Sequence, residues 1–349
     1  MEKSLKKIAE TYHISVATLS RVVNNKGNVR PETKEKVLEI LKKEQYVPNY
    51  MARSLKTNSS TTIGIIVPDI SQKLFAGIIR GINRKLFESG YLVLLSDSEE
   101  SSDKEKRYLD LMLRQCVDGL VIATVDPEHI DFGRFYALGI PVVFIDTIPD
   151  TELQVDAVLV DDYMVGQKIA KYFLGKGHTK IAVLTGCSSG FSPSVQRLKG
   201  FLDTCEKQGV SIPKEMVCKL PYSQDESYRA VKKILERRDT KPVTAIAAMH
   251  ELMTIGAVRA IREQDLAIGE DISLIGCDLN ERLQLFRPQI TGVEQPEEEI
   301  GETVAGLLLQ RLRQKNKEGA DAMRESIGQK ILLNPRFVAR DSCKNIVSM

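Results

Sequence analysis

The chain is organised around the stretch Ile14-Ser15-Val16-Ala17-Thr18-Leu19-Ser20-Arg21-Val22-Val23-Asn24-Asn25. A short amphipathic helix over Leu5 to Tyr12 precedes it, because apolar residues recur there at the i, i+3 and i+4 positions of one helical face. A tight turn separates the two segments. Together they predict a helix-turn-helix in which the quoted stretch is the second helix, the one that enters a DNA groove.

The second helix has two faces of different character. Leu19, Val22 and Val23 point back to a small core, while Ser15 can cap the helix by accepting a hydrogen bond from a first-turn amide. Arg21 is the candidate for a base contact, because its planar guanidinium can bind both acceptors of a guanine. An ordinary helical hairpin would show the same periodicity, so that alternative stays open here. The side chains expected to meet DNA are Ser15, Val16, Ala17, Thr18, Ser20, Arg21 and Asn25.

A third helix completes a predicted headpiece over residues 1–47. Pro31 occupies its first position, where the missing amide costs nothing, and apolar residues recur on its inner face. Pro48-Asn49 then breaks the chain. Residues 48–60 contain a short helix-capable segment and a polar run, which by themselves indicate a linker.

Charge is divided unevenly along the 349-residue chain. Residues 1–60 contain 12 Lys plus Arg against 6 Glu and no Asp, a net charge of +6, whereas the other 289 residues carry 37 basic and 41 acidic groups. A cationic headpiece joined to a slightly acidic remainder is typical of a protein that binds nucleic-acid phosphates through one small domain.

From Ile63 onward, short apolar runs of β type alternate with amphipathic helical patterns. This alternation predicts parallel sheets with helices on both faces, and more than 280 residues exceed one core, so we expect two such domains side by side. Ligands of such sheets bind at the carboxyl ends of the strands, here between the two domains. The expected strands are Ile63–Val67, Tyr91–Leu95, Gly119–Ala123, Val142–Asp146, Ala157–Val160, Ile181–Leu184, Ala245–Ala248 and Ile272–Gly276.

Several features point to the cytoplasm. The six cysteines are scattered without a C-x-x-C pair, as expected of free thiols in a reducing compartment. The N-terminal residues lack the apolar core of a signal peptide, and no apolar run approaches membrane-spanning length. We therefore expect a cytoplasmic protein with no membrane partner.

Segments along the whole chain resemble the LacI/GalR family of repressors. The resemblance begins with Ser15-Val16-Ala17-Thr18-Leu19-Ser20-Arg21-Val22, which looks like the family signature. Motifs so numerous and so widely spaced make the resemblance specific. It continues through Tyr46-Val47-Pro48-Asn49, Ala52-Arg53-Ser54-Leu55, Ile63-Gly64-Ile65-Ile66-Val67-Pro68-Asp69, Gly177-His178, Arg197-Leu198-Lys199-Gly200-Phe201 and Ile275-Gly276-Cys277-Asp278.

The resemblance implies the α/β fold of periplasmic sugar-binding proteins for residues 61–341, built as two lobes of parallel sheet with three chain crossings between them. We place the crossings near Asp161-Asp162, Ile290-Thr291 and Ala322-Met323. The first lobe then comprises about residues 61–161 and 292–322, the second about residues 162–291 and 323–341, and residues 342–349 form a tail.

The resemblance also assigns roles to residues of the linker. In the family this segment is a hinge helix that orders on the operator. The leucine that matches Leu55 then enters the minor groove from each subunit. Arg53 and Lys56 would lie near phosphate or minor-groove edges.

An effector site is expected at the cleft between the lobes. Arg197 lies early in a helix that follows an expected strand, and Asp278 ends another strand; a guanidinium and a carboxylate suit sugar hydroxyls. From the residues alone, either could instead belong to a surface ion pair. In the resembled family both matching residues bind effector. The further effector candidates are Phe75, Asp146, Tyr222 and His250, with Asp161 as a weaker match.

Two departures from the family pattern lie at this cleft. His250-Glu251 stands where Asn-Asp is common, and Gln72-Lys73-Leu74 precedes Phe75 where Asn-Pro-Phe is common. Neutral drift would explain both. A histidine and a lysine facing the cleft would instead suit an acidic or phosphorylated sugar. The expected effector is therefore a sugar, a sugar acid or a sugar phosphate.

Catalysis has little support in the sequence. Gly186-Cys187-Ser188-Ser189-Gly190 fits the G-x-S-x-G pattern of a hydrolase, but no histidine follows His250, and Pro193 interrupts the helix that should follow. His250-Glu251-Leu252-Met253-Thr254 begins like H-E-x-x-H but ends in threonine, so it supplies no second zinc ligand. We expect no enzyme, no catalytic or metal site and no cofactor.

Together these features predict a homodimeric transcriptional repressor controlled by a small molecule bound between the core lobes. Two headpieces would read a pseudo-palindromic operator in double-stranded DNA. A sugar-binding protein that does not read DNA is the alternative, and a DNA-bending protein without a ligand is a third hypothesis. The chain after Asp341 has no heptad pattern, which favours a dimer over a tetramer.

Overall fold

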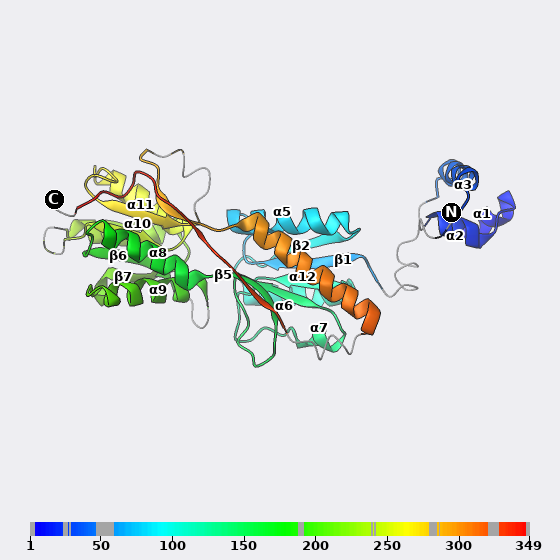
Figure 1. Cartoon of the computed structure of the whole chain (residues 1–349), viewed down its shortest axis with the longest axis horizontal. Helices are drawn as coiled ribbons and strands as arrows, with labels where there is room; N and C mark the ends of the chain where they lie inside the picture. Colours follow the sequence, from blue (N-terminus) through cyan, green and yellow to red (C-terminus); the bar gives the residue numbers. More distant parts are fainter. Residues whose placement is uncertain are drawn as a thin grey trace. The chain divides into compact units, whose positions relative to one another are not determined.

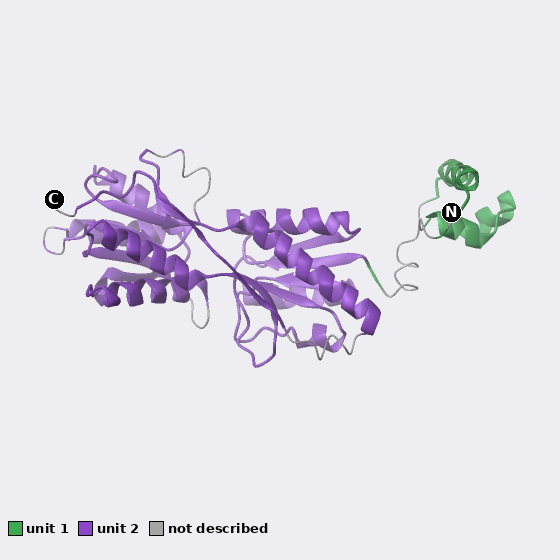
Figure 2. Ribbon diagram, viewed as in Figure 1, with its two compact units in different colours: residues 1–60 green, residues 61–349 purple. Residues whose placement is uncertain are grey.

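The computed structural model describes residues 4–23, 27, 29–46, 59–187, 192–238, 240, 242–278, 285, 287–319 and 328–346. The chain divides into two compact units, Met1–Ser60 and Thr61–Met349, which are coloured separately in Figure 2. No helix among the described residues is both long enough and apolar enough to span a bilayer.

The first unit is a three-helix headpiece, as the sequence predicts. Its helices are α1 (Leu5–Tyr12), α2 (Val16–Val23) and α3 (Pro31–Lys43). They share a small core in which each helix contributes two buried side chains. That core consists of Ile8, Ala9, Leu19, Val22, Val37 and Ile40.

The second unit contains two sheets of six described strands each, and the predicted fold class is confirmed (Figure 1). The first sheet has the order β11-β5-β4-β3-β1-β2, and its pairs are all parallel. Its strands are β1 (Thr62–Val67), β2 (Leu92–Asp97), β3 (Gly119–Ile122), β4 (Val142–Ile145), β5 (Asp156–Val160) and β11 (Lys330–Leu333).

The second sheet has the order β12-β10-β9-β8-β6-β7, in which only the β10–β12 pair is antiparallel among the described strands. Its strands are β6 (Ile181–Gly186), β7 (Val217–Leu220), β8 (Ala245–Ala248), β9 (Ser273–Cys277), β10 (Thr291–Glu294) and β12 (Arg336–Val338).

Helices cover both faces of each sheet because alternate strand residues are apolar on both sides. Ile63 and Ile65 of β1 pack with α5 and α12, while Ile66 packs on the opposite face with α6 and α7. In the second lobe, α8 and α9 cover one face and α10 and α11 the other. The helices are α5 (Lys73–Glu88), α6 (Ser102–Arg114), α7 (Gly133–Ala137), α8 (Asp162–Gly175), α9 (Pro193–Lys207), α10 (Gln224–Glu236), α11 (Glu251–Glu263) and α12 (Glu297–Glu318), with a short 3₁₀ turn at Lys214–Met216.

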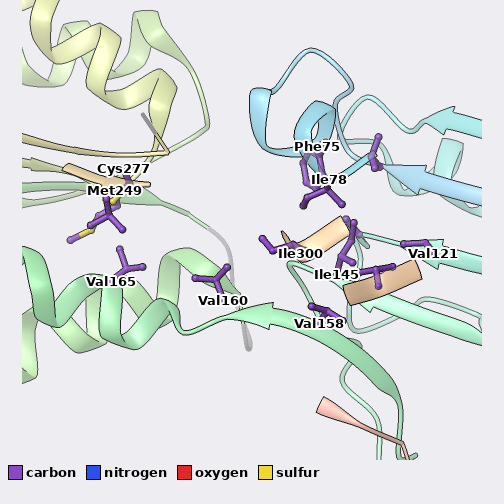
Figure 3. Packing of buried hydrophobic residues seen from close by; sticks show 14 of the residues in the cluster. Phe75, Ile78, Val121, Ile145, Val158, Val160, Val165, Met249, Cys277 and Ile300 are labelled. Carbon is purple, nitrogen blue, oxygen red and sulfur yellow. The ribbon is translucent and has the colours of Figure 1, made fainter. Parts of the chain in front are cut away.

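One hydrophobic cluster runs through both lobes (Figure 3). Phe75 and Ile300 belong to it on the first-lobe side, Val165 and Met249 on the second-lobe side, and Val160 lies between them. β5 of the first lobe ends at Val160, and α8 of the second lobe begins at Asp162. The chain therefore crosses between the lobes at Asp161, next to the buried cluster that contains Val160.

Two of the expected chain crossings are wrong. β10 pairs with β9 and β12, so the chain leaves the second lobe after Glu294 and not at Ile290-Thr291. β11 pairs with β5, so the last crossing follows Leu333 and not Ala322-Met323. The strands concerned are short, and a strand's own residues do not reveal which sheet supplies its hydrogen-bond partners.

The expected tail after Asp341 is also wrong for its first part. Ser342 and Cys343 are buried in the second lobe. The Ser342 hydroxyl accepts a hydrogen bond from the Thr291 amide at 2.8 Å, and the Ile346 amide donates to the Lys176 carbonyl at 2.8 Å. Residues 342–346 therefore belong to the core, while residues 347–349 lie outside the described chain.

Candidate functional site

The exposed face of α2 coincides with the residues expected to meet DNA. Ser15 caps the helix, since its Oγ accepts a hydrogen bond from the Thr18 amide at 3.0 Å. Leu19 is fully buried, whereas Val16 is 46% exposed. No described residue forms an ion pair or hydrogen bond with the Arg21 guanidinium. Of the other candidates, Ser15, Ala17 and Arg21 are exposed and Thr18 and Ser20 are half-buried, while Asn25, Arg53, Leu55 and Lys56 lie outside the described residues.

A cavity of about 300 Å³ lies between the two lobes of the core. It opens at the carboxyl ends of parallel strands from both sheets, where ligands of such sheets bind. Asp146, for example, follows β4 of the first sheet, and Asp278 follows β9 of the second. All six expected effector residues line it: Phe75, Asp146, Arg197, Tyr222, His250 and Asp278.

Arg197 is the centre of the polar network in this cavity. It is only 3% exposed, and its Nε donates to Asp162 Oδ1 at 2.7 Å. Its Nη1 donates to Asp278 Oδ2 at 2.7 Å and to the Met249 carbonyl at 2.8 Å. Burial works against the charge, but Asp278 and Asp162 hold the pKa of Arg197 well above its usual value. The guanidinium therefore stays charged and positions Asp278 at the cavity wall.

Asp278 and Asp146 present carboxyl groups in different protonation states. Both follow a strand with positive φ, 56° and 61°. Burial opposes ionisation of Asp278, yet Arg197 keeps its pKa below the usual value, so Asp278 accepts hydrogen bonds as a carboxylate. Burial, reinforced by Asp162, raises the pKa of Asp146 to about 7. Near neutral pH the Asp146 carboxyl group is therefore partly protonated and partly ionised. The protonated form can donate a hydrogen bond to a ligand, and the ionised form can only accept one.

This raised pKa predicts a pH-dependent stability. Between about pH 4 and pH 7 the folded protein binds a proton that the unfolded chain has released, so the free energy of unfolding falls as the pH rises through this window. Asp146→Asn removes the effect. From pH 4 to pH 7 we expect the free energy of unfolding of the variant to rise by about 3 to 4 kcal/mol relative to the parent chain, measured by urea unfolding. A difference that does not change with pH would contradict the raised pKa.

His250 serves as the N-cap of α11. Its Nδ1 accepts a hydrogen bond from the Leu252 amide at 3.2 Å, and its ring lies 4.5 Å from the Tyr222 ring, centroid to centroid. Burial lowers the pKa of His250 to about 4. The imidazole is therefore neutral at physiological pH.

Several residues of this site have no clear signal in the sequence. Asp162, the second carboxylate bound to Arg197, carries no local signal beyond its place at a helix start. Gln295, whose Nε2 donates to Asp278 Oδ1 at 2.5 Å, follows the unexpected strand β10. Asp161, the weaker effector candidate, does not line the cavity. It caps α8 by accepting from the Met164 amide at 2.8 Å.

The charges at the cavity do not favour an acidic effector. Lys73, the lysine of that hypothesis, is not among the lining residues, and its Nζ lies 3.2 Å from Glu297. His250 is neutral, and Arg197 is already paired with two carboxylates. The acidic side chains that line the cavity are Glu100, Asp146, Glu251 and Asp278.

The described cysteines form no disulfide. Cys205, Cys277 and Cys343 are buried, as expected of structural thiols, whereas Cys116 and Cys187 are exposed. Burial raises the pKa of Cys277 to about 12, so this thiol beside Arg197 stays protonated. No group of three or more metal-ligating side chains occurs within the part of the chain that the structure describes.

Two family models match the chain. Residues 4–49 match bacterial regulatory proteins of the lacI family, and residues 60–331 match the periplasmic binding proteins and sugar binding domain of the LacI family. Together they cover both units described above.

Individual proteins match over nearly the whole chain. Catabolite control protein A of Priestia megaterium is 32% identical over 324 residues, which are 92% of this chain and 95% of that protein. The structure of the lac repressor dimer bound to operator and the anti-inducer ONPF has a TM-score of 0.82 at 24% identity, covering 99% of this chain and 100% of that one. A regulator from Enterococcus faecium with bound ribose has a TM-score of 0.68 at 27% identity, covering 82% and 99%.

Proposed function

This chain belongs to the LacI family of bacterial regulatory proteins, and we propose that it is a homodimeric repressor whose operator binding responds to a sugar-like effector in the cavity between the core lobes. It is a DNA-binding regulator and not an enzyme. We infer a cytoplasmic location from this DNA-binding role.

The DNA-reading half of the proposal rests on α2. An exposed Arg21 on the same face as the small side chains Val16 and Ala17 fits the major groove, where a guanidinium recognises guanine. The net charge of +6 in residues 1–60 supplies attraction to phosphates, which contributes affinity without sequence preference. Two headpieces related by a two-fold axis would read the two halves of a pseudo-palindromic operator.

The effector half rests on one observation: the cavity is lined at the carboxyl ends of strands from both lobes, with Asp146 on the first lobe and the Arg197–Asp278 pair on the second. A ligand that contacts Asp146 of the first lobe and Asp278 of the second would favour one angle between the lobes. Its binding free energy would thereby be coupled to operator affinity, typically by about 1 to 3 kcal/mol. An uncharged, hydroxylated ligand fits the excess of carboxyl groups better than an acid or a phosphate.

The proposal is tested by selecting bound sites from a random pool of double-stranded DNA, with and without a panel of sugars, sugar acids and sugar phosphates. We expect a two-fold symmetric site whose recovery changes with one compound. A symmetric site that no compound affects would contradict the effector half. Failure to enrich any site would contradict the repressor function and favour a sugar-binding protein that does not read DNA.

A further inference from the structure

His250 lines the effector cavity, and helix α11 determines which of its ring nitrogens can donate a hydrogen bond. His250 is the N-cap of α11, and its Nδ1 accepts from the Leu252 amide at 3.2 Å. An imidazole nitrogen that accepts a hydrogen bond from a backbone amide is unprotonated. In the neutral ring the proton is therefore on Nε2.

The neutral form of His250 persists across the physiological range, because burial lowers its pKa to about 4. The ring is also positioned by Tyr222, whose ring centroid lies 4.5 Å away at an interplanar angle of 42°. No residue in the described ranges accepts a hydrogen bond from Nε2. His250 is half-buried and belongs to the cavity wall, so this N–H can be donated to a ligand bound there.

The carboxyl groups of the cavity wall have the opposite character. Asp278 is a carboxylate bound by Arg197 and Gln295, and Asp146 and Glu100 add further carboxyl groups. Carboxylates accept hydrogen bonds, while a neutral imidazole with its Nδ1 engaged only donates. His250 therefore contributes one N–H donor to a wall that also contains carboxylate acceptors, the hydroxyl groups of Thr147 and Ser194 and the amide of Gln72.

We propose that His250 is a specificity-determining residue that offers the effector a single hydrogen-bond donor, so that the effector group opposite it must be an acceptor such as a hydroxyl, ether or carbonyl oxygen. This inference rests on the proposed effector function and concerns which ligands the cavity selects. An ammonium group at that position would place N–H against N–H and leave both buried donors unpaired. An anionic group there would meet the donor but also the surrounding carboxyl groups.

Two variants separate this donor from the other roles of His250. Asparagine and aspartate are nearly the same size, and both are favourable N-caps, so His250→Asn and His250→Asp should each preserve α11. When its oxygen caps the helix, asparagine still presents an N–H donor, whereas aspartate presents only an acceptor. The two variants therefore differ from each other mainly in whether this position donates or accepts a hydrogen bond, and in one charge.

The experiment uses the full chain and isothermal titration with D-glucose, D-galactose, D-mannose and D-ribose, each beside its amino, acid and phosphate derivatives. We expect the tightest ligand to be uncharged, and the derivative whose amino group replaces the oxygen opposite His250 to bind about tenfold to hundredfold more weakly. His250→Asn should retain this preference, and His250→Asp should lose or invert it. In parallel, ¹⁵N-histidine NMR at neutral pH should show the Nε2-protonated tautomer for the signal that disappears in His250→Asn.

The outcomes distinguish this inference from the proposed function. An Nδ1-protonated ring, a preference for the amino compound, or the same preference in the Asn and Asp variants would overturn the donor role. So would the absence of binding by every uncharged sugar while operator binding persists. If the unsubstituted parent chain bound no operator at all, that result would instead count against the repressor function.

Discussion

Arg197→Met is expected to lower the free energy of unfolding of the core by about 3 to 5 kcal/mol and to abolish the effector response. The guanidinium lies 2.7 Å from Asp162 and 2.7 Å from Asp278, and it is 3% exposed. Its removal leaves two carboxylates in a poorly solvated site with no compensating charge. Asp278 then also loses the partner that positions it at the cavity wall. Urea unfolding and sugar titration measure the two effects.

The same substitution at an exposed ion pair provides the matched control. Arg80 pairs with Glu298 at 3.4 Å, with side chains 71% and 45% exposed. Arg80→Met should therefore cost less than about 1 kcal/mol. Equal unfolding midpoints for the two methionine variants would refute the importance of the buried network.

A triple variant separates stability from binding. Adding Asp162→Asn and Asp278→Asn to Arg197→Met removes the uncompensated charges, so part of the lost stability should return. The effector response should stay absent, because the carboxylate that would accept the ligand hydroxyls is gone. Recovery of both properties would show that Asp278 has no role in binding.

Arg21→Ala is expected to reduce discrimination between the operator and unrelated DNA by about tenfold to hundredfold per half-site, and by the product of the two factors in a dimer. The reason is that the exposed guanidinium on α2 is the candidate for two hydrogen bonds to guanine. Effector binding should not change, because the cavity lies wholly within the second unit. Fluorescence anisotropy with selected and scrambled sites, at one salt concentration, measures the ratio.

Two further variants control this result. Lys36→Ala removes the same charge from an exposed position on α3, and it should leave the ratio of the two affinities unchanged. Asp278→Ala should do the reverse of Arg21→Ala, removing the effector response while preserving operator discrimination. If Arg21→Ala and Asp278→Ala impaired the same property, that result would disprove that operator recognition and effector binding occur at separate sites.

Local patterns in the sequence predicted most of the elements that carry function. The helices Leu5–Tyr12 and Val16–Val23 were predictable because apolar periodicity and the Ser15 cap act within a few residues. All eight expected strands are present, since each is a nearly continuous apolar run. By contrast, β7, β10, β11 and β12 were missed because each has only three or four residues, and all but β10 are partly exposed.

What the sequence by itself determined is therefore the class of protein: a headpiece that reads DNA, a two-lobed α/β core and the cleft positions of Arg197 and Asp278. Only the tertiary structure decided how these groups behave. Asp162 lies 35 residues before Arg197 and binds it, and the tautomer of His250 depends on a helix amide. The pKa of Asp146 depends on its burial and on carboxylates from the other lobe. Hydrogen bonds and charges act through space, so their partners are unknown until the chain has folded.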